Sequence, residues 1–198
     1  MSALDETRNP WTTRASNVVY ENPWISVRHD EVIDPSGRDG IYGVVSPKNW
    51  ALGVLAFFDD ATTLLVGQYR YPLGRYSWEM PEGGGSKAEP MQISIARELR
   101  EETGYSAASW FKLFDAITLS NSVTDEYADM WLAWDLASGV AEPESTEDLA
   151  IRRVPFTDAV AMVWDGAIFD SMTVMAIAKT EAMRLRGELP TALASILH

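Results

Sequence analysis

Three glutamates near the middle of the chain carry the strongest chemical signal in the sequence. Glu98, Glu101 and Glu102 follow the spacing i, i+3, i+4, which places them on one flank of a helix at a cost of roughly a few tenths of a kcal/mol per pair. We expect Arg97 and Arg100 to project toward other sides of this helix and to offset only part of the repulsion. A divalent cation would turn the repulsion into coordination, because Mg²⁺ and Mn²⁺ prefer oxygen ligands. The alternative is a solvated acidic face, and the spacing alone leaves both open.

The neighbouring residues predict the helix that must position these glutamates. Glu89 and Pro90 fit a helix start, with an acid near the positive end of the helix dipole and a proline in the first turn. Gly104 fits the left-handed position just past the helix end. Apolar residues recur at every fourth position and give the helix one face to bury, namely Met91, Ile95 and Leu99.

A longer pattern contains this helix. It begins with a glycine run and continues at fixed spacing as Gly83, five residues, Glu89, seven residues, then Arg97-Glu98-Leu99-Arg100-Glu101-Glu102-Thr103-Gly104. The pattern resembles the Nudix box, the signature of hydrolases that cleave nucleoside diphosphates linked to another group. One position departs from it: Tyr105 stands where an aliphatic residue is usual, and an aromatic ring can fill the same buried position.

The resemblance implies a metal centre and roles for several residues. Glu98, Glu101 and Glu102 would hold Mg²⁺, with Mn²⁺ as the alternative, and Arg97 would orient these glutamates. Glu82 precedes the box, close to the backbone carbonyl that binds metal in the family. A carboxylate in the charged segment Gly139–Asp148 would activate water; counting back from Val154-Pro155 indicates Glu147 for this role, with Glu144 as the nearest alternative.

The flanking sequence narrows the resemblance. The segment QYRYPLGRYSWEMPEGG, which begins at Gln68, is similar to the corresponding stretch of the branch that hydrolyses ADP-ribose and other nucleoside diphosphate sugars. In that branch Arg70 would contact phosphate, although an ion pair with Glu79 explains it nearly as well. Glu126 matches an acid that binds substrate or metal, and Trp50 is a candidate for the base pocket or for the core. Asn121 stands where the ADP-ribose branch has a proline.

Composition limits the class of protein. The 198 residues contain no cysteine and two histidines, so acid–base chemistry falls mainly to carboxylates, tyrosine or lysine. The net charge of −13 argues against nonspecific nucleic-acid binding, which needs a basic surface. No apolar run reaches the roughly 18 residues that a membrane span needs, and the first residues lack the pattern of a secretory signal. We therefore expect a cytoplasmic protein.

The order of predicted elements gives the domain organisation. Residues 1–46 should form an N-terminal tail, loose to about residue 16, followed by an antiparallel β meander, with its aromatic residues in a small satellite core: Trp11, Tyr20, Trp24 and Tyr42. Residues 47–198 should form the catalytic domain, with a hairpin of Asn49–Phe58 and Thr62–Tyr69. Further strands are predicted at 76–80, 110–119, 128–136 and 149–156, and helices at 158–164 and 170–186.

The Nudix resemblance implies an α/β fold, with an α/β/α sandwich around a mixed sheet and an antiparallel β extension that packs against a second subunit. The expected activity is metal-dependent hydrolysis of a nucleoside diphosphate sugar, of the ADP-ribose, ADP-glucose or GDP-mannose type. Three alternatives are a strict ADP-ribose pyrophosphatase, an enzyme acting on dinucleoside polyphosphates or damaged nucleoside triphosphates, and a sensor that binds a nucleotide sugar without turnover.

Overall fold

The structure is a computed structural model that describes residues 7–142 and 148–198. It divides into two compact units. The first contains the residues up to Lys48 together with Ser120–Glu126, and the second contains Asn49–Leu119 and Tyr127–His198. Each unit is described by itself.

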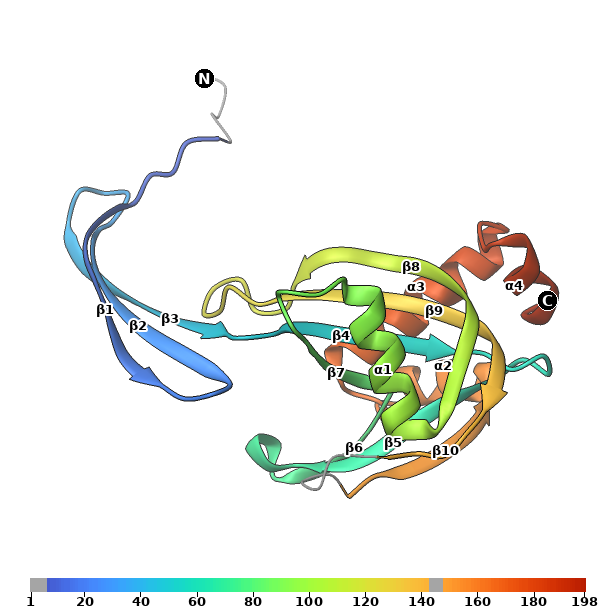
Figure 1. The fold of residues 1–198 in the computed structure, drawn as a ribbon. Coiled ribbons are helices and arrows are strands. Elements are labelled where there is room, and N and C mark those ends of the chain that lie inside the picture. The colour runs from blue at the N-terminus through green and yellow to red at the C-terminus, as the bar shows by residue number, and fades with distance from the viewer. Residues whose placement is uncertain (1–6, 143–147) are drawn as a thin grey trace. The chain divides into compact units, whose positions relative to one another are not determined.

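The first unit is a three-stranded antiparallel sheet with the order β1-β2-β3, drawn in blue in Figure 1. Its strands are β1 (Thr12–Glu21), β2 (Ile25–Ile33) and β3 (Asp39–Pro47). The predicted meander is confirmed, but the prediction of a loose chain to about residue 16 was wrong, because Thr12 already pairs with Ile33. The segment Ser120–Glu126 joins this unit: the Val45 N–H donates to the Val123 carbonyl at 2.9 Å.

The prediction of a satellite core fails for three of the four aromatic residues, since Trp11 is also 39% exposed. The side chains of Tyr20 and Trp24 are 55% and 71% exposed. A three-stranded sheet covered by no helix can bury little, so apolar residues on its free face stay in contact with solvent. Trp11 and Tyr42 do meet, edge to face, with ring centroids 5.5 Å apart.

The second unit is built on two sheets. The larger has the order β7-β4-β9-β8 and is mixed, since β4 and β9 are parallel whereas the two outer pairs are antiparallel. The smaller, β10-β5-β6, is antiparallel throughout. The strands are β4 (Trp50–Ala56), β5 (Thr62–Arg70), β6 (Arg75–Glu79), β7 (Glu82–Gly85), β8 (Tyr105–Thr118), β9 (Tyr127–Ser138) and β10 (Ala150–Pro155).

The predicted hairpin of the second unit is only partly correct. Its turn is present, since the Phe58 N–H donates to the Thr62 carbonyl at 2.9 Å and Ala61 has a φ of 60°. Beyond a single bridge between Phe57 and Thr63, however, β4 and β5 pair with other strands. Leu52–Ala56 of β4 and Thr63–Gly67 of β5 are buried. The two strands are therefore held in the core by other partner strands and not by pairing with each other.

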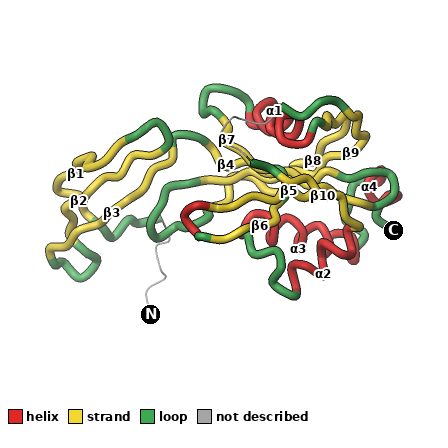
Figure 2. The backbone as a smooth tube through the Cα atoms, turned by 90° about the horizontal axis from the view of Figure 1, so that it is seen from below, coloured by secondary structure: helices red, strands yellow, loops and turns green. Residues whose placement is uncertain are grey.

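Helices cover both faces of the sheets in this unit (Figure 2). One face carries α1 (Met91–Thr103), and the other carries α2 (Phe156–Trp164) and α3 (Ser171–Arg186). A 3₁₀ turn (Tyr71–Leu73) and the short α4 (Thr191–Ile196) were not predicted. The predicted α/β/α sandwich around a mixed sheet, with an antiparallel N-terminal extension, is thus confirmed. None of the helices in the described part of the chain is long and apolar enough to cross a membrane.

Alternation along β4 divides the core in two. Leu52 and Val54 point toward α1, where they form one apolar cluster with Ile95, Leu99 and Trp131. Leu55 and Phe57 lie in the second cluster, which includes Met172 and Ala176 of α3. Each large aliphatic side chain buried in this way contributes about 1.5–3 kcal/mol. The predicted assignment of the α3 methionines to the core is confirmed, and Lys179, which interrupts their stripe, donates to the Leu113 carbonyl at 2.6 Å.

Candidate active site

The helix α1 holds the glutamate-rich flank much as the sequence predicts. Ile95 and Leu99 are fully buried, and Gly104 ends the helix with a φ of 76°, donating its N–H to the Arg100 carbonyl. Pro90 was predicted inside the first turn but is the N-cap, so the helix begins one residue later than predicted. Packing of the apolar face turns Glu102 inward as well, so that its side chain is 3% exposed. A buried carboxyl group needs polar or cationic partners.

The backbone at the start of the glycine run lies directly against two of the glutamates. The Glu82 N–H donates to Glu102 Oε2 at 3.1 Å. A Cβ atom added to Gly83 would lie 2.3 Å from Cδ of Glu98, so a larger residue at this position would displace the Glu98 side chain. The strand that enters the box and the helix that ends it therefore bring a stretch of backbone and two carboxyl groups to one place.

This place has the chemistry of a divalent metal site. Glu98 and Glu102 carry carboxylate oxygens, and the backbone of Glu82 and Gly83 lies beside them; hard cations accept both carboxylate and main-chain carbonyl oxygens as ligands. Residues 7–142 and 148–198 contain no cluster of three or more His, Cys, Asp or Glu side chains gathered for a metal ion. The donor set that fits Mg²⁺ or Mn²⁺ is therefore two carboxylates with main-chain oxygen, and Glu101 stands beside it.

Arg97 lies among the glutamates, contrary to the expectation from spacing that it projects elsewhere, and its role in orienting them, which the box resemblance implies, stays a prediction. Its guanidinium nitrogens are 3.3 Å from Glu98 Oε1, 3.5 Å from Glu89 Oε1 and 3.7 Å from Glu101 Oε2. The spacing argument failed because an arginine side chain is long enough to reach neighbouring positions on the helix surface. Arg100 also reaches Glu101, at 3.8 Å. The two arginines offset the repulsion that the glutamates create.

Arg70 forms an ion pair with Glu79, as one of its two predicted roles requires. The Arg70 Nε lies 3.0 Å from both carboxylate oxygens of Glu79, and Nη2 also contacts Oε2. Glu79 is only 2% exposed, whereas the Arg70 side chain is 36% exposed. The buried acid thus has a partner whose guanidinium still reaches solvent. The predicted contact of Arg70 with phosphate stays a prediction.

The Glu82 side chain turns away from the box glutamates. Its Oε1 accepts a hydrogen bond from the Thr173 hydroxyl of α3 at 3.0 Å. Burial raises the pKa of Glu82 well above its usual value, and the neighbouring carboxyl of Asp170 raises this pKa further. Only the backbone of Glu82 therefore faces Glu102. The sequence does not predict the part played by Thr173, although Asp170 three residues earlier is a recognisable N-cap signal, and its carboxylate accepts the Thr173 N–H at 2.8 Å.

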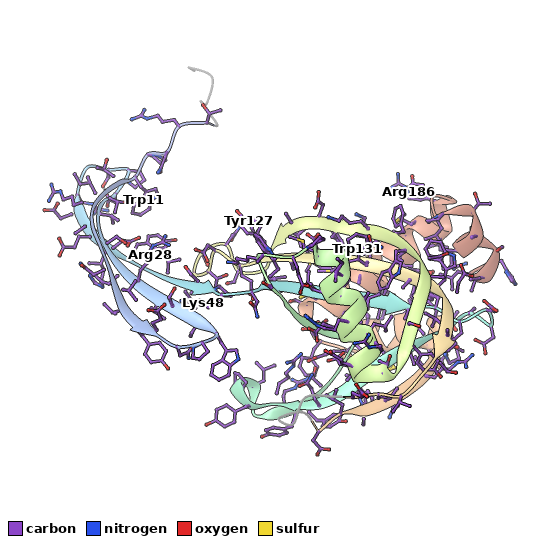
Figure 3. All side chains as sticks on the ribbon, viewed as in Figure 1. Trp11, Arg28, Lys48, Tyr127, Trp131 and Arg186 are labelled. Carbon is purple, nitrogen blue, oxygen red and sulfur yellow. The ribbon has the colours of Figure 1, made fainter. Side chains whose placement is uncertain are left out.

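Two of the remaining predicted residues, Trp50 and Glu126, have surroundings of their own. Trp50 pairs with Gly85 in the β4–β7 ladder and lies edge to face with Tyr127, at 6.1 Å between ring centroids. Figure 3 shows Tyr127 at the start of β9. Glu126 belongs to the first unit, and burial raises its pKa. Glu144 and Glu147 lie outside the described residues.

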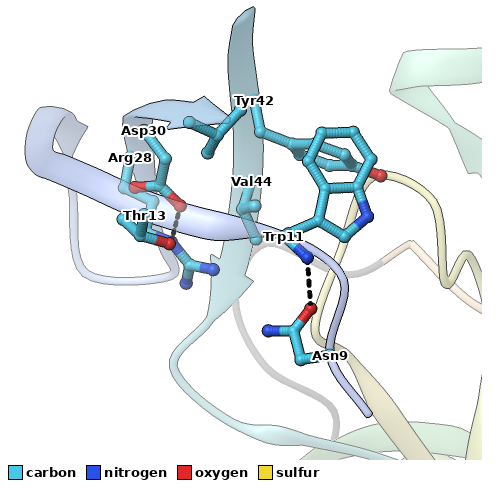
Figure 4. A pocket seen from close by; sticks show the side chains of 8 residues that line it. Asn9, Trp11, Thr13, Arg28, Asp30, Tyr42 and Val44 are labelled. Atoms are coloured by element: carbon cyan, nitrogen blue, oxygen red, sulfur yellow. Dashed lines mark hydrogen bonds and ion pairs between the residues drawn. The ribbon is translucent and has the colours of Figure 1, made fainter. Parts of the chain in front are cut away.

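The first unit has a hollow of its own, of about 270 Å³ (Figure 4). Trp11 and Tyr42 form an aromatic wall, and Arg28 contributes a cation whose Nε is 2.9 Å from Asp30 Oδ2. Asp30 is 7% exposed and also accepts from Ser16 Oγ at 2.5 Å. Hydrogen bonds from Ser16 and Arg28 lower the pKa of Asp30. The charge of Arg28 is thus partly neutralised by its ion pair with the buried Asp30.

Comparison with known proteins decides the family. Residues 47–172 match the NUDIX domain. The chain belongs to the Nudix hydrolase family. Residues 11–45 of this Nudix hydrolase match the "Nucleoside diphosphate sugar hydrolase N-terminal domain". The resemblance drawn from the box is confirmed.

Relatives of this Nudix hydrolase include ADP-ribose pyrophosphatases and GDP-mannose pyrophosphatases. It is 31% identical to an ADP-ribose pyrophosphatase of Mycobacterium tuberculosis, over 86% of this chain and 83% of the relative. It is 32% identical to a GDP-mannose pyrophosphatase of Yersinia enterocolitica, over 73% of this chain and 81% of the relative. A solved structure of an ADP compounds hydrolase has the same fold, with a TM-score of 0.79, 19% identity and coverage of 90% of this chain and 97% of that one.

Proposed function

We propose that this Nudix hydrolase cleaves the pyrophosphate bond of a nucleoside diphosphate sugar, of the ADP-ribose, ADP-glucose or GDP-mannose type. Water adds to one phosphorus atom, the bridging P–O bond breaks, and the products are a nucleoside monophosphate and a sugar phosphate. Relatives named for ADP-ribose and for GDP-mannose support the substrate class. These names differ in base and sugar and share the class of nucleoside diphosphate sugars.

The observation that carries the proposal is the close approach of the glycine run to α1. The Glu82 N–H reaches Glu102, and Gly83 packs on the carboxyl group of Glu98. Such an arrangement gathers oxygen ligands where a negatively charged diphosphate needs its charge neutralised. In a protein with a net charge of −13, a bound divalent cation would supply this neutralisation locally.

We assign Glu98, Glu102 and the Glu82 carbonyl as ligands of Mg²⁺, or of Mn²⁺, with Glu101 beside them. The bound metal would neutralise the phosphates and lower the pKa of a water molecule. Arg97 orients the glutamates through its contacts with Glu98 and Glu101. Glu147, with Glu144 as the alternative, would accept a proton from the attacking water.

Substrate binding is assigned to three further residues, Arg70, Trp50 and Glu126. The forked guanidinium of Arg70 suits the paired oxygens of a pyrophosphate, and its side chain is 36% exposed. Trp50 and Glu126 would contact the nucleoside or the sugar. We further propose a homodimer in the cytoplasm, in which residues 1–46 form the extension that contacts the second subunit. Nucleic acid and membranes are not expected as partners.

The proposal is tested by measuring hydrolysis of ADP-ribose, ADP-glucose and GDP-mannose with Mg²⁺, for the wild type and for Glu102→Gln. Loss of one metal ligand is expected to lower kcat/KM at least about 100-fold. Glu188→Gln is the matched control, because Glu188 is exposed, pairs with Arg186 and lies outside the box. The activity of this variant should equal that of the wild type.

Each alternative has its own outcome in this experiment. Equal turnover by the wild type and Glu102→Gln would contradict the metal assignment. Turnover of ADP-ribose alone would indicate a strict ADP-ribose pyrophosphatase. A dinucleoside polyphosphate is measured beside the three sugars, and turnover of that substrate alone would exclude nucleotide sugars. Calorimetric binding of a nucleotide sugar in Mg²⁺ without product release would favour a sensor.

A further inference from the structure

The three residues before the glycine run are each held by a different part of the second unit. The Met80 N–H donates to Thr173 Oγ1 at 3.0 Å. The Pro81 carbonyl accepts from the Val54 N–H at 3.0 Å, and the Glu82 N–H donates to Glu102 at 3.1 Å. No residue of this segment is therefore free to shift its backbone alone.

One hydroxyl group serves both ends of this segment. Thr173 Oγ1 accepts from Met80 and donates to Glu82 Oε1, so its donor and one acceptor site are both used. Thr173 is fully buried and Met80 is 1% exposed, which removes water as a replacement partner. A buried N–H that loses its acceptor is destabilised by the full desolvation cost. The Met80 N–H therefore favours a backbone position at which it reaches Thr173 Oγ1.

Thr173 is itself fixed by the start of α3. Its N–H donates to the Asp170 carboxylate, which caps the helix. Glu82 is consequently held from both faces of the sheet, by α3 through its side chain and by α1 through its N–H, and these helices lie on opposite sides in Figure 2. The peptide that follows, between Glu82 and Gly83, contains the carbonyl assigned to the metal.

We propose that Thr173 and the Glu82 side chain act as a latch that positions the Glu82 carbonyl and thereby sets the affinity for the metal ion. The latch rests on the metal assignment of the proposed function. Thr173 touches neither metal nor substrate, so it is a positioning residue. Groups that orient metal ligands typically change metal affinity 10–100-fold when they are replaced.

The test compares Thr173→Val with Thr173→Ser in full-length protein. Valine keeps the shape but removes the hydroxyl, whereas serine keeps the hydroxyl and loses a buried methyl group. Binding of Mn²⁺ without substrate is measured by electron paramagnetic resonance of the free ion, and stability by urea unfolding. We expect about 10–100-fold weaker Mn²⁺ binding for valine, near-wild-type binding for serine, and some loss of stability in both.

A second pair of variants examines the other side of the latch. Glu82→Gln keeps an oxygen that can accept the Thr173 hydrogen bond and should bind Mn²⁺ like the wild type. Glu82→Ala removes that oxygen and should bind it more weakly, while Met80 keeps its own bond to Thr173.

Three results would overturn the latch. The first is that Thr173→Val and Glu82→Ala both bind Mn²⁺ with the affinity of the wild type. The second is that Thr173→Val and Thr173→Ser lose the same Mn²⁺ affinity, in proportion to their loss of stability. The third is that the wild type binds no Mn²⁺. A wild type that binds Mn²⁺ but hydrolyses no nucleotide sugar would instead remove only the proposed function. The two failures are therefore distinguishable.

Discussion

At the scale of single residues, the candidate site contains carboxyl groups that form ion pairs with arginines. Arg97 reaches three glutamates of the box, and Arg70 pairs with Glu79 on the hairpin that leads into it. Both arginines keep about a third of their side chains exposed. Each can therefore stabilise the fold and still meet a phosphate group.

The Arg70–Glu79 pair gives a prediction on stability. Arg70→Met leaves the buried Glu79 carboxylate unpaired and should lower the free energy of unfolding by about 2–4 kcal/mol, below the full value for a buried pair because Arg70 is partly exposed. Arg75→Met is the control, because Arg75 is exposed and lies 3.3 Å above the centre of the Phe169 ring. This substitution should lower the free energy of unfolding by no more than about 1 kcal/mol.

Urea unfolding of both single variants, of Glu79→Gln and of the double variant Arg70→Met/Glu79→Gln measures the coupling. Equal stability losses for Arg70→Met and Arg75→Met would refute the structural role of the pair. A larger rise in KM for Arg70→Met than for Arg75→Met, under conditions where both are folded, would support the predicted phosphate contact.

Sequence alone could predict the box residues but not all of their partners. Residue type and spacing identify Glu98 and Glu102, because the box fixes both. The contacts of Arg97 were misjudged, since spacing describes where a side chain starts and not how far it reaches. Thr173 could not be found, because its partners Met80 and Glu82 lie more than ninety positions away and only folding brings them together.

At the scale of elements, Gly104 ends α1 in two ways: it adopts the left-handed conformation, and it leaves room for the backbone at 139–141. Gly104 has a φ of 76°, and a Cβ atom there would lie 2.8 Å from the Ala141 backbone nitrogen. Gly104→Ala should therefore cost the strain of the left-handed conformation, about 1–2 kcal/mol, plus the displacement of the chain at 139–141. That chain leads into the segment in which Glu147 is predicted to act.

Gly187 provides a matched control for Gly104. It ends α3 with a φ of 67°, but an added Cβ atom would meet nothing within 4 Å. Gly187→Ala should therefore show only the strain, about 1–2 kcal/mol, and unchanged kcat. If urea unfolding gives the same loss for both variants, the backbone contact at Gly104 is not tight in solution.

Elements with a strong local pattern were predicted well. The helix Met91–Thr103 and the helix Ser171–Arg186 fall within about a residue of their expected limits, because caps and apolar periodicity act locally. The pairing of β4 and β5 was mispredicted, since the choice of a strand's partner depends on the whole core. The short α4 was missed because six residues give periodicity too little length to register.

At the scale of the whole molecule, the first unit exposes several large apolar side chains. Large apolar side chains are at least half exposed on β1, on β3 and in the turn after β1: Val18, Val19, Tyr20, Trp24 and Ile41. Such patches on a protein surface mark interaction sites. This observation supports the proposed homodimer, with a second copy of the chain as the partner.

Trp24→Lys tests this assembly. Trp24 is 71% exposed, so the substitution should leave the fold of each unit intact, while a charge buried at an interface is costly. Light scattering after gel filtration should give a dimer for the wild type and a monomer for Trp24→Lys. Trp164→Lys, at an even more exposed tryptophan of the second unit (80%), should stay dimeric. If both variants remain dimers, another surface joins the subunits; if activity falls only with the monomer, the second subunit contributes to the active site.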